Sequence, residues 1–243
     1  LLHDDVVDDS AVRRGQDTAN EIWGNEASVL VGDFLYTRAF EMMVELNDMT
    51  TMEVFSRTTN QIAEGEVMQL MHVHDPAVTQ ERYEEVIYRK TAVLFEAGCR
   101  LAARLTAPDN PALESAAGDY GRHLGIAFQL ADDALDYDGE AEAIGKNIGD
   151  DLAEGKPTLP LIHCLAHCDK PTRHIIEKAI ETGGRTAIEP VTTAIAQTGS
   201  IAYTRGLAEQ EANRAEAALA AFPDSDFRTA LSELARFSVG RRY

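Results

Sequence analysis

Several features that mark special classes of protein are scarce or missing in this sequence. The 243 residues include only three cysteines, a sparse and odd number that suits reduced thiols in the cytoplasm. No apolar run approaches the length needed to cross a bilayer, and no basic segment followed by an apolar one marks a signal peptide. Glycine- or serine-rich linkers, low-complexity stretches and short repeats are also missing. We therefore expect a cytoplasmic protein without a transmembrane segment.

Positive charge is scarce as well. The chain has 22 Lys and Arg against 41 Asp and Glu, and its formal net charge is -19. So acidic a protein should repel nucleic acid and anionic membrane surfaces, and we expect no nucleic-acid partner. It should also repel an anionic substrate, unless cations or local basic groups intervene.

What the sequence does contain is apolar residues at helical spacing along most of its length. Alternating runs with hairpin turn chemistry, which would indicate strands, are not found. Helices are expected over about 27–46, 52–71, 79–105, 112–137, 171–182, 186–197, 201–221 and 224–237, and another is expected to start at Pro157. Glycines among acidic residues and two lysines predict a functional loop over 138–156. We predict one all-α domain, residues 1–243.

Two Asp-Asp-x-x-Asp motifs stand out: Asp4, Asp5 and Asp8 form the first, and Asp132, Asp133 and Asp136 the second. On a helix, the first and last aspartates of each motif lie one turn apart on the same face, where like charges repel. Because apolar residues surround both motifs, the carboxylates need a counter-charge. Clustered hard oxygen ligands suit Mg2+ or Ca2+, and Mg2+ binds few carboxylates together with substrate phosphates. Two such clusters on facing helices could hold a diphosphate through bridging metal ions.

A single copy of this motif in an acidic protein is more often a solvated face than a site. Basic residues after each copy favour a site instead, because Arg and Lys match phosphate groups. Arg13 and Arg14 follow the first motif, and Lys146 and Lys156 follow the second. Lys90 lies inside the helix expected over 79–105. The ordered combination predicts a diphosphate site.

These motifs, in this order, resemble those of the trans-isoprenyl diphosphate synthases, also called polyprenyl synthetases. Residues 4–8 with Arg13-Arg14-Gly15 are similar to the family's first aspartate-rich motif, and residues 128–136 to its second. Lys90-Thr91 resembles the family's Lys-Thr pair, and residues 145–151 the loop that follows. The resemblance covers essentially the whole chain. Segments 30–40, 62–67 and 149–160 are most similar to the bacterial octaprenyl diphosphate synthases, which make the side chain of ubiquinone-type quinones.

The resemblance implies a single-domain helical bundle of the isoprenoid-synthase type around a central cavity. We expect its N-terminal helices to be missing here, because the helical pattern opens at Leu1 without an initiator Met. It implies up to three Mg2+ ions, with Asp4, Asp8 and Asp132 as direct ligands and Asp5, Asp133 and Asp136 as ligands or their partners. The allylic diphosphate is then expected to contact Arg13, Lys90, Thr91, Gln129, Lys146 and Lys156. Arg14 is expected to hold isopentenyl diphosphate.

The implied reaction extends an allylic diphosphate, expected to be farnesyl diphosphate, with isopentenyl diphosphate. Its product would be a long all-trans-polyprenyl diphosphate, expected to be octaprenyl, for quinone side chains. The allylic carbon–oxygen bond ionises, the double bond of isopentenyl diphosphate attacks the cation, and a proton is lost. The resemblance further implies a homodimer and a product that is delivered to the membrane.

Two alternatives remain open. A non-catalytic subunit of a heteromeric prenyl synthase would have a decayed second motif, whereas its three aspartates are present. A terpene cyclase would carry an Asn-Asp/Ser-Glu metal motif in place of the second aspartate motif.

Three further groups of residues allow more than one interpretation. We interpret His72 and His74 as part of a polar loop rather than as a metal-binding pair, and Cys164 and Cys168 as buried small residues rather than as a disulfide. Arg241-Arg242 is either a segment that closes over substrate or a frayed basic tail.

Overall fold

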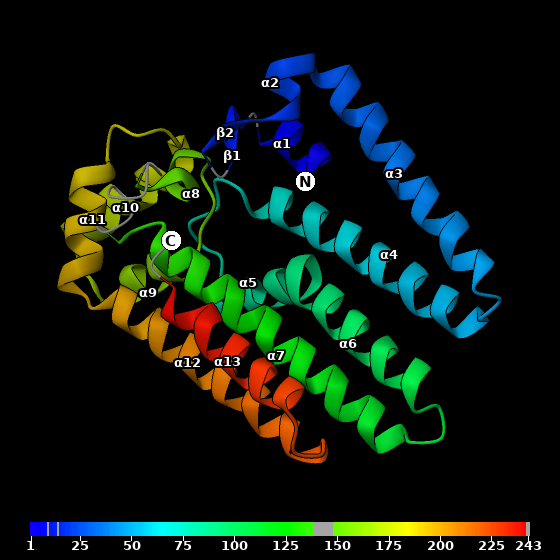
Figure 1. Cartoon of the computed structure of the whole chain (residues 1–243). Helices are drawn as coiled ribbons and strands as arrows, with labels where there is room; N and C mark the ends of the chain where they lie inside the picture. Colours follow the sequence, from blue (N-terminus) through cyan, green and yellow to red (C-terminus); the bar gives the residue numbers. More distant parts are fainter. Residues whose placement is uncertain (9, 14, 139–147, 242–243) are drawn as a thin grey trace. The chain divides into compact units, whose positions relative to one another are not determined.

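The computed structural model describes residues 1–8, 10–13, 15–138 and 148–241, and these are almost entirely helical (Figure 1). The prediction of an all-α chain is therefore confirmed. None of the helices in these ranges combines the length and the apolar character that a membrane span requires. The elements are α1 (Leu2–Val7), β1 (Val12–Arg13), β2 (Gln16–Asp17), α2 (Ala19–Trp23), α3 (Asn25–Glu45), α4 (Met49–His72), α5 (Gln80–Ile87), a π-helical turn (Tyr88–Ala92), α6 (Val93–Thr106), α7 (Pro111–Leu135), α8 (Asp150–Ala153), α9 (Leu159–His167), α10 (Lys170–Thr182), α11 (Ile188–Gln197), α12 (Ser200–Ala218), a 3-10 turn (Leu219–Ala221) and α13 (Asp226–Gly240).

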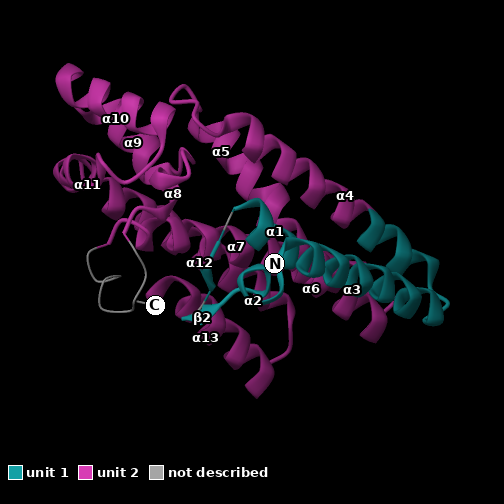
Figure 2. Cartoon of the chain, turned by 90° about the horizontal axis from the view of Figure 1, so that it is seen from above, with its two compact units in different colours: residues 1–56 teal, residues 57–243 magenta. Residues whose placement is uncertain are grey.

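The chain divides into two compact units, residues 1–56 and 57–243 (Figure 2). Helix α4 begins in the first unit and continues into the second. Each aspartate motif belongs to a different unit, and each is described within its own unit below. The expectation of a single domain over residues 1–243 stays a prediction.

In the first unit, α1 packs on α3 where α3 carries the small residues Ser28 and Gly32. The Ser28 hydroxyl donates to the Leu2 carbonyl over 2.9 Å. A Cβ at Gly32 would come within 2.5 Å of the His3 ring, so only glycine leaves room for that ring. His3 in turn lies 3.0 Å from the Asp33 carboxylate. These contacts position the helix that carries the first motif.

The predicted break between α3 and α4 is confirmed. Asn47 adopts a positive φ of 53°, which ends α3. The Asp48 carboxylate accepts hydrogen bonds from the amides of Thr50 and Thr51, over 3.2 and 3.1 Å, at the first turn of α4. An aspartate in this position satisfies amides that have no partner within the helix.

In the second unit, α7 is the central helix and packs against α6, α12 and α13. Asn110 caps its first turn by accepting from the Leu113 amide over 3.1 Å, and Pro111 occupies the first turn, where proline is tolerated. Its buried face includes Tyr120, Leu124, Leu130 and Leu135. Each fully buried aliphatic side chain contributes about 1.5–3 kcal/mol, so this face anchors the helix that carries the second motif.

Four local features differ from the sequence-based expectation. The helix predicted over 79–105 begins after the expected Thr79 but is interrupted by the π-helical turn Tyr88–Ala92. Pro157 lies before α9, where Pro160 takes the first-turn position instead. The short hairpin of β1 and β2 was not predicted, because two-residue strands are too short to show an alternating pattern. The loop expected over 138–156 contains α8, while its residues 139–147 lie outside the described residues.

Candidate active site

The first motif occupies α1 and the residue that ends it. Asp4 and Asp5 belong to the helix, and Asp8 follows it in helical conformation. The Asp8 amide donates to the Asp4 carbonyl over 2.7 Å, so the helical geometry continues through the motif. Asp4 and Asp8 therefore share one face, as predicted. Their side chains are partly exposed, whereas Asp5 is buried.

Asp5 is held by Arg13 from the following hairpin. The Arg13 Nε donates to the Asp5 Oδ1 over 2.6 Å, and the Asp5 side chain is only 5% exposed. The hairpin is fastened near its start by the Thr18 hydroxyl, which donates to the Ser10 carbonyl over 2.6 Å. Arg13 thus completes the motif as a partner of its middle aspartate. Arg14, expected to hold isopentenyl diphosphate, lies outside the described residues.

The second motif repeats this arrangement at the end of α7. Asp132 and Asp133 belong to the helix, Asp136 follows it, and the Asp136 amide donates to the Asp132 carbonyl over 3.1 Å. The Asp132 side chain is 39% exposed, whereas Asp133 is 3% exposed. The Asp136 oxygens accept from the amides of Asp150 and Asp151, over 3.1 and 3.2 Å, at the start of α8. The two motifs therefore share a pattern of accessible outer aspartates around a buried middle one.

Asp133 joins three helical elements. It accepts hydrogen bonds from the Tyr83 hydroxyl of α5 and from the Gln129 amide, the latter over 2.8 Å. The Gln129 carbonyl oxygen accepts from the Thr91 hydroxyl of the π-helical turn over 3.0 Å. Burial, followed by the charge of Asp151, raises the pKa of Asp133 to about 8, against the lowering effect of the two hydrogen bonds. The middle aspartate is thus part of the framework, and sequence spacing alone could not identify partners so far away in the chain.

The segment after the second motif adds a further carboxylate and a lysine. Asp151 is half-buried, and desolvation and the nearby charge of Asp136 raise its pKa well above its usual range. The Lys156 ammonium opposes this shift, and the Lys156 amide donates to the Asp151 carbonyl over 2.8 Å. The Lys156 side chain also forms an ion pair with Glu154. Lys146, expected to hold the allylic diphosphate, lies outside the described residues.

Lys90 lies in the π-helical turn, a feature that often occurs at functional sites. Its Nζ is 2.9 Å from the Glu66 carboxylate and donates to the Gln69 carbonyl oxygen over 2.7 Å. A Cβ at Gly65 would lie 2.7 Å from the Lys90 amide nitrogen, so Gly65 lets this turn approach α4 closely. Two side chains of α4 therefore hold the Lys90 ammonium in place, and the Glu66 carboxylate balances its charge.

Arg241 contacts the second motif directly. This contact argues against a frayed basic tail, one of the two interpretations left open by the sequence. Its guanidinium donates to the Asp132 Oδ1 over 3.2 Å and to the Phe128 carbonyl over 3.1 Å. It also lies 4.0 Å above the Phe128 ring. Its side chain is only 13% exposed, so it is not part of a frayed tail. Arg242 lies outside the described residues.

The structure also tests the interpretations of His74 and of the cysteines Cys164 and Cys168. His74 adopts a positive φ of 65°, its amide donates to the Gly155 carbonyl over 2.8 Å, and its Nδ1 lies 2.9 Å from the Ile180 carbonyl oxygen. It is a structural loop residue, as predicted. Cys164 is buried, as predicted, whereas Cys168 is half-buried, and both are free thiols.

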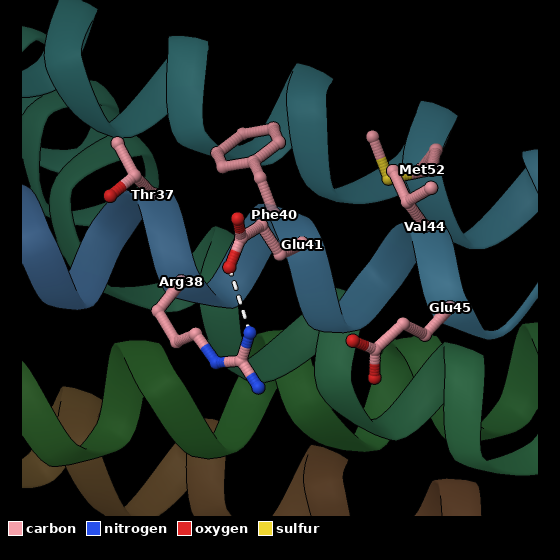
Figure 3. A pocket seen from close by; sticks show the side chains of 7 residues that line it. All are labelled: Thr37, Arg38, Phe40, Glu41, Val44, Glu45 and Met52. Carbon is pink, nitrogen blue, oxygen red and sulfur yellow. Dashed lines mark hydrogen bonds and ion pairs between the residues drawn. The ribbon is translucent and has the colours of Figure 1, made fainter.

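A hollow of about 530 Å³ in the first unit lies apart from the first motif along α3 (Figure 3). Phe40, Val44 and Met52 supply apolar side chains, while Arg38 and Glu41 pair over 2.8 Å. These α3 residues lie at least ten residues, or nearly three helical turns, beyond Ser28, which contacts α1. Arg38, the cation in the lining, is already paired with Glu41, so this hollow is not our candidate site for a diphosphate.

Comparison with known proteins decides the family. The sequence profile of the polyprenyl synthetase family matches residues 1–198. The chain belongs to this family. It is an enzyme of the trans-prenyltransferase class, and both alternatives raised by the sequence are set aside.

Individual relatives agree with this assignment. The chain is 54% identical over 242 residues to the octaprenyl diphosphate synthase of Escherichia coli (strain K12), covering 99% of this chain and 75% of that protein. It is 44% identical over 241 residues to the geranyl-diphosphate-specific all-trans-nonaprenyl-diphosphate synthase of Rhodobacter capsulatus, covering 99% and 74%. The crystal structure of a polyprenyl synthase from Caulobacter crescentus CB15, complexed with calcium and isoprenyl diphosphate, matches with a TM-score of 0.93. Its sequence is 49% identical, and the match covers 100% of this chain and 74% of that one. The predicted isoprenoid-synthase fold is confirmed.

Proposed function

We propose that this protein extends farnesyl diphosphate with successive isopentenyl diphosphate units to all-trans-octaprenyl diphosphate, for a quinone side chain. Identity to the Escherichia coli octaprenyl enzyme, at 54%, exceeds identity to the Rhodobacter capsulatus nonaprenyl enzyme, at 44%, and supports the eight-unit product. The observation that carries the chemistry is the pattern common to both motifs. In each, two outer aspartates share one helical face while the middle one is buried against protein donors.

Mg2+ fits the donors that this pattern presents. Carboxylate oxygens are its preferred protein ligands, and it usually keeps water and binds substrate phosphates as well. Among the residues that the structure describes, no three His, Cys, Asp or Glu side chains are gathered closely enough to hold a metal alone. Phosphate oxygens would therefore complete the shell. The Caulobacter crescentus relative was crystallised with calcium, another cation that takes oxygen ligands, and with isoprenyl diphosphate.

We assign the ligands from the accessibility of the carboxylates. Asp4, Asp8, Asp132 and Asp136 would hold up to three Mg2+ ions. Asp5 and Asp133 are buried and bonded to Arg13, Tyr83 and Gln129, so they position the outer aspartates. When bound, Mg2+ supplies positive charge that stabilises the leaving diphosphate.

The basic side chains are paired with carboxylates in the absence of substrate. Arg13 pairs with Asp5, Lys90 with Glu66, and Lys156 with Glu154. We propose that these cations turn toward the phosphate oxygens of the allylic substrate. Because the protein has a net charge of -19, an anionic substrate needs such local positive groups. Thr91 and Gln129 would donate hydrogen bonds to the same diphosphate. Lys146 would join them, and Arg14 would hold isopentenyl diphosphate.

The bond changes then need no side-chain nucleophile. The allylic carbon–oxygen bond breaks, and its electron pair leaves with the diphosphate. The double bond of isopentenyl diphosphate forms the new carbon–carbon bond. The isopentenyl unit loses one proton, which the departing diphosphate accepts, and the chain has grown by one unit.

We also propose that the protein is a cytoplasmic homodimer that delivers its product to the membrane. The apolar surface of α3 supports the dimer: Leu30, Val31, Phe34, Leu35, Met42 and Val44 are each at least half exposed. An apolar surface of this kind on a helix usually marks a protein interface. The free thiols Cys99, Cys164 and Cys168 support a reducing compartment.

The test is to incubate the full-length protein with Mg2+, labelled isopentenyl diphosphate and either farnesyl or geranyl diphosphate, and to size the products. We expect one dominant octaprenyl product from farnesyl diphosphate and no elongation after Mg2+ is chelated. A dominant product of another length would reject the octaprenyl assignment. No elongated product from either primer would reject the proposed reaction.

A further inference from the structure

Arg241 directly follows α13 and is held at the end of α7 by hydrogen bonds and a ring contact. Its Nη2 donates to the Phe128 carbonyl oxygen over 3.1 Å and to the Asp132 Oδ1 over 3.2 Å. Its Nε donates to the Ser238 carbonyl oxygen over 3.2 Å. The guanidinium carbon lies 4.0 Å from the centroid of the Phe128 ring. These contacts, on a side chain that is only 13% exposed, hold the guanidinium in one place.

The helix that precedes Arg241 is itself anchored on α7. The Tyr120 hydroxyl of α7 donates to the Leu231 carbonyl of α13 over 2.9 Å, and Ala235 of α13 is buried. Helix α13 packs against both α7 and α12 (Figure 1). The Arg241 amide donates to the Phe237 carbonyl over 3.0 Å, so its backbone continues the hydrogen bonding of α13. The backbone that carries the guanidinium is therefore fixed relative to the second motif.

The two outer aspartates of the second motif each have a donor that sets the direction of the carboxylate. The amides of Asp150 and Asp151 donate to the Asp136 oxygens over 3.1 and 3.2 Å. The Arg241 guanidinium donates to Asp132. Asp132 is 39% exposed, and the last torsion of an aspartate side chain has a broad preference, so packing alone holds this carboxylate loosely. A fixed donor removes rotational freedom that metal binding would otherwise have to remove.

We propose that Arg241 is a positioning residue that holds the Asp132 carboxylate in the orientation that binds Mg2+. Because Asp132 is a Mg2+ ligand only under the proposed function, this role of Arg241 rests on that function. Carboxylates that bind metals are usually hydrogen-bonded to neighbouring groups, and losing such a neighbour typically costs about 10–100-fold in metal affinity or activity. Arg241 acts through Asp132.

The charge of Arg241 alone predicts the opposite effect, which gives the test its sign. A guanidinium beside a metal ligand repels a cation, so removing it would strengthen metal binding. Removing a donor that orients the ligand weakens metal binding instead. The metal affinity of Arg241→Ala therefore separates a positioning role from simple charge repulsion.

Mn2+ replaces Mg2+ in the binding measurement, because both cations take carboxylate and water ligands and free Mn2+ is measured by electron paramagnetic resonance. Each full-length protein is titrated with Mn2+ and saturating farnesyl diphosphate, with isopentenyl diphosphate omitted so that no chain elongation occurs. The same titration without protein gives the background. The matched control is Arg236→Ala, because Arg236 is also an arginine of the α13 segment but pairs with Glu216 of α12.

We expect Arg241→Ala to bind Mn2+ at least ~10-fold more weakly than wild type, and Arg236→Ala to bind it as wild type does. Equal or tighter binding in Arg241→Ala would overturn the proposal, as would an equal loss in Arg236→Ala. Circular dichroism checks that both variants are folded. In the elongation assay, Arg241→Ala should need more Mg2+ for half-maximal turnover, and saturating Mg2+ should restore its kcat. A kcat that stays low would contradict a role limited to positioning the metal ligand.

Asp132→Asn, titrated with Mn2+ in the same way, separates this proposal from the proposed function. If Asp132→Asn binds Mn2+ as wild type does, the assignment of Asp132 as a metal ligand fails. If Asp132→Asn binds Mn2+ weakly while Arg241→Ala binds it as wild type does, only the positioning role of Arg241 fails.

Discussion

At the scale of single residues, the middle aspartate of each motif is a structural anchor. Asp5 receives a hydrogen bond from a guanidinium, and Asp133 receives hydrogen bonds from a phenol and an amide. A buried carboxylate without such donors would cost several kcal/mol. These donors orient the helix turn that presents the outer aspartates. The three carboxylates of a motif are thus chemically alike but differ in accessibility.

Replacing Arg13 with alanine should leave the Asp5 carboxylate buried without its partner. Breaking a fully buried pair costs about 3–5 kcal/mol, and because Arg13 is 38% exposed we expect a smaller loss of ~1–3 kcal/mol in the free energy of unfolding. Urea denaturation measures this loss. The double variant Arg13→Ala/Asp5→Asn, which removes the unpaired charge, should recover most of it. An unchanged unfolding midpoint in Arg13→Ala would contradict the structural role.

The double variant also separates the two roles assigned to Arg13. If Arg13 holds the allylic diphosphate as well, the KM for that substrate should stay raised although stability returns. If the KM of the double variant returns to the wild-type value together with the stability, Arg13 has only the structural role.

The residue-scale features were predictable only in part. Spacing predicted that Asp132 and Asp136 share a helical face, because helix geometry alone decides it. It could not predict that Tyr83 would hold Asp133, since only the packing of α5 on α7 brings them together. Arg241 was missed as a partner of Asp132 for the same reason.

At the scale of elements, the π-helical turn and the start of α6 approach the backbone of α7 closely at two of its glycines. A Cβ at Gly125 would lie 2.6 Å from the Ala92 Cα, and a Cβ at Gly121 would lie 2.3 Å from the Phe95 carbonyl oxygen. Such distances are far below van der Waals contact, so any larger residue forces the helices apart. Lys90 and Thr91 belong to the turn that would have to move.

The matched substitutions Gly125→Ala and Gly98→Ala test this packing. Gly125→Ala should destabilise the fold by ~1–3 kcal/mol through overpacking. At Gly98 of α6, a Cβ meets nothing within 4 Å, so the substitution should be neutral or stabilising by ~0.5–1 kcal/mol, the usual effect of replacing a helical glycine. Thermal or urea unfolding compares the two. Equal stability of both variants would contradict the close approach of α7 to the turn.

Gly125→Ala should also raise the KM for the allylic diphosphate, because it displaces Lys90 and Thr91, whereas Gly98→Ala should not. This comparison links the packing of the element to the proposed substrate contacts.

Element boundaries were predictable where a local chemical signal exists. The helix ends expected at about residues 46, 79, 105 and 112 each lie within one residue of the observed ends, because caps and proline act within a few residues. The π-helical turn carries no such signal. It is a tertiary adjustment that brings Lys90 onto Glu66 and Thr91 onto Gln129, and both partners are more than twenty residues away.

At the scale of the whole molecule, charge and apolar surface point to different partners. The net charge of -19 disfavours binding of anions except at the basic groups of the candidate site. Helix α3 instead exposes apolar side chains on adjacent turns, including Leu30, Phe34 and Leu35. Sequence periodicity predicted α3 as a helix but could not tell whether its apolar residues face this chain or a second copy.

The proposed homodimer can be tested with Phe34→Glu and Phe227→Glu. Both phenylalanines are exposed, at 65% and 84%, but Phe227 belongs to α13. A charge at the centre of an apolar interface should lower the affinity of the dimer strongly, so Phe34→Glu should sediment as a monomer in analytical ultracentrifugation. Phe227→Glu should sediment as wild type does. Dimers of equal stability in both variants would exclude the α3 surface as the interface.

The most direct test of the account compares the Mg2+ dependence of chain elongation in Asp132→Asn and Asp133→Asn. Asp132 is assigned as a metal ligand, and losing one is worth several kcal/mol in the transition state, on the order of 100-fold or more in rate. We expect Asp132→Asn to lose that much turnover and to need more Mg2+, while its unfolding midpoint stays near that of wild type. Asp133→Asn should keep the wild-type Mg2+ requirement, because its carboxyl is bonded to Tyr83 and Gln129. Near-normal turnover in Asp132→Asn, or an equal rise in Mg2+ requirement in both variants, would contradict the division between accessible ligands and a buried anchor.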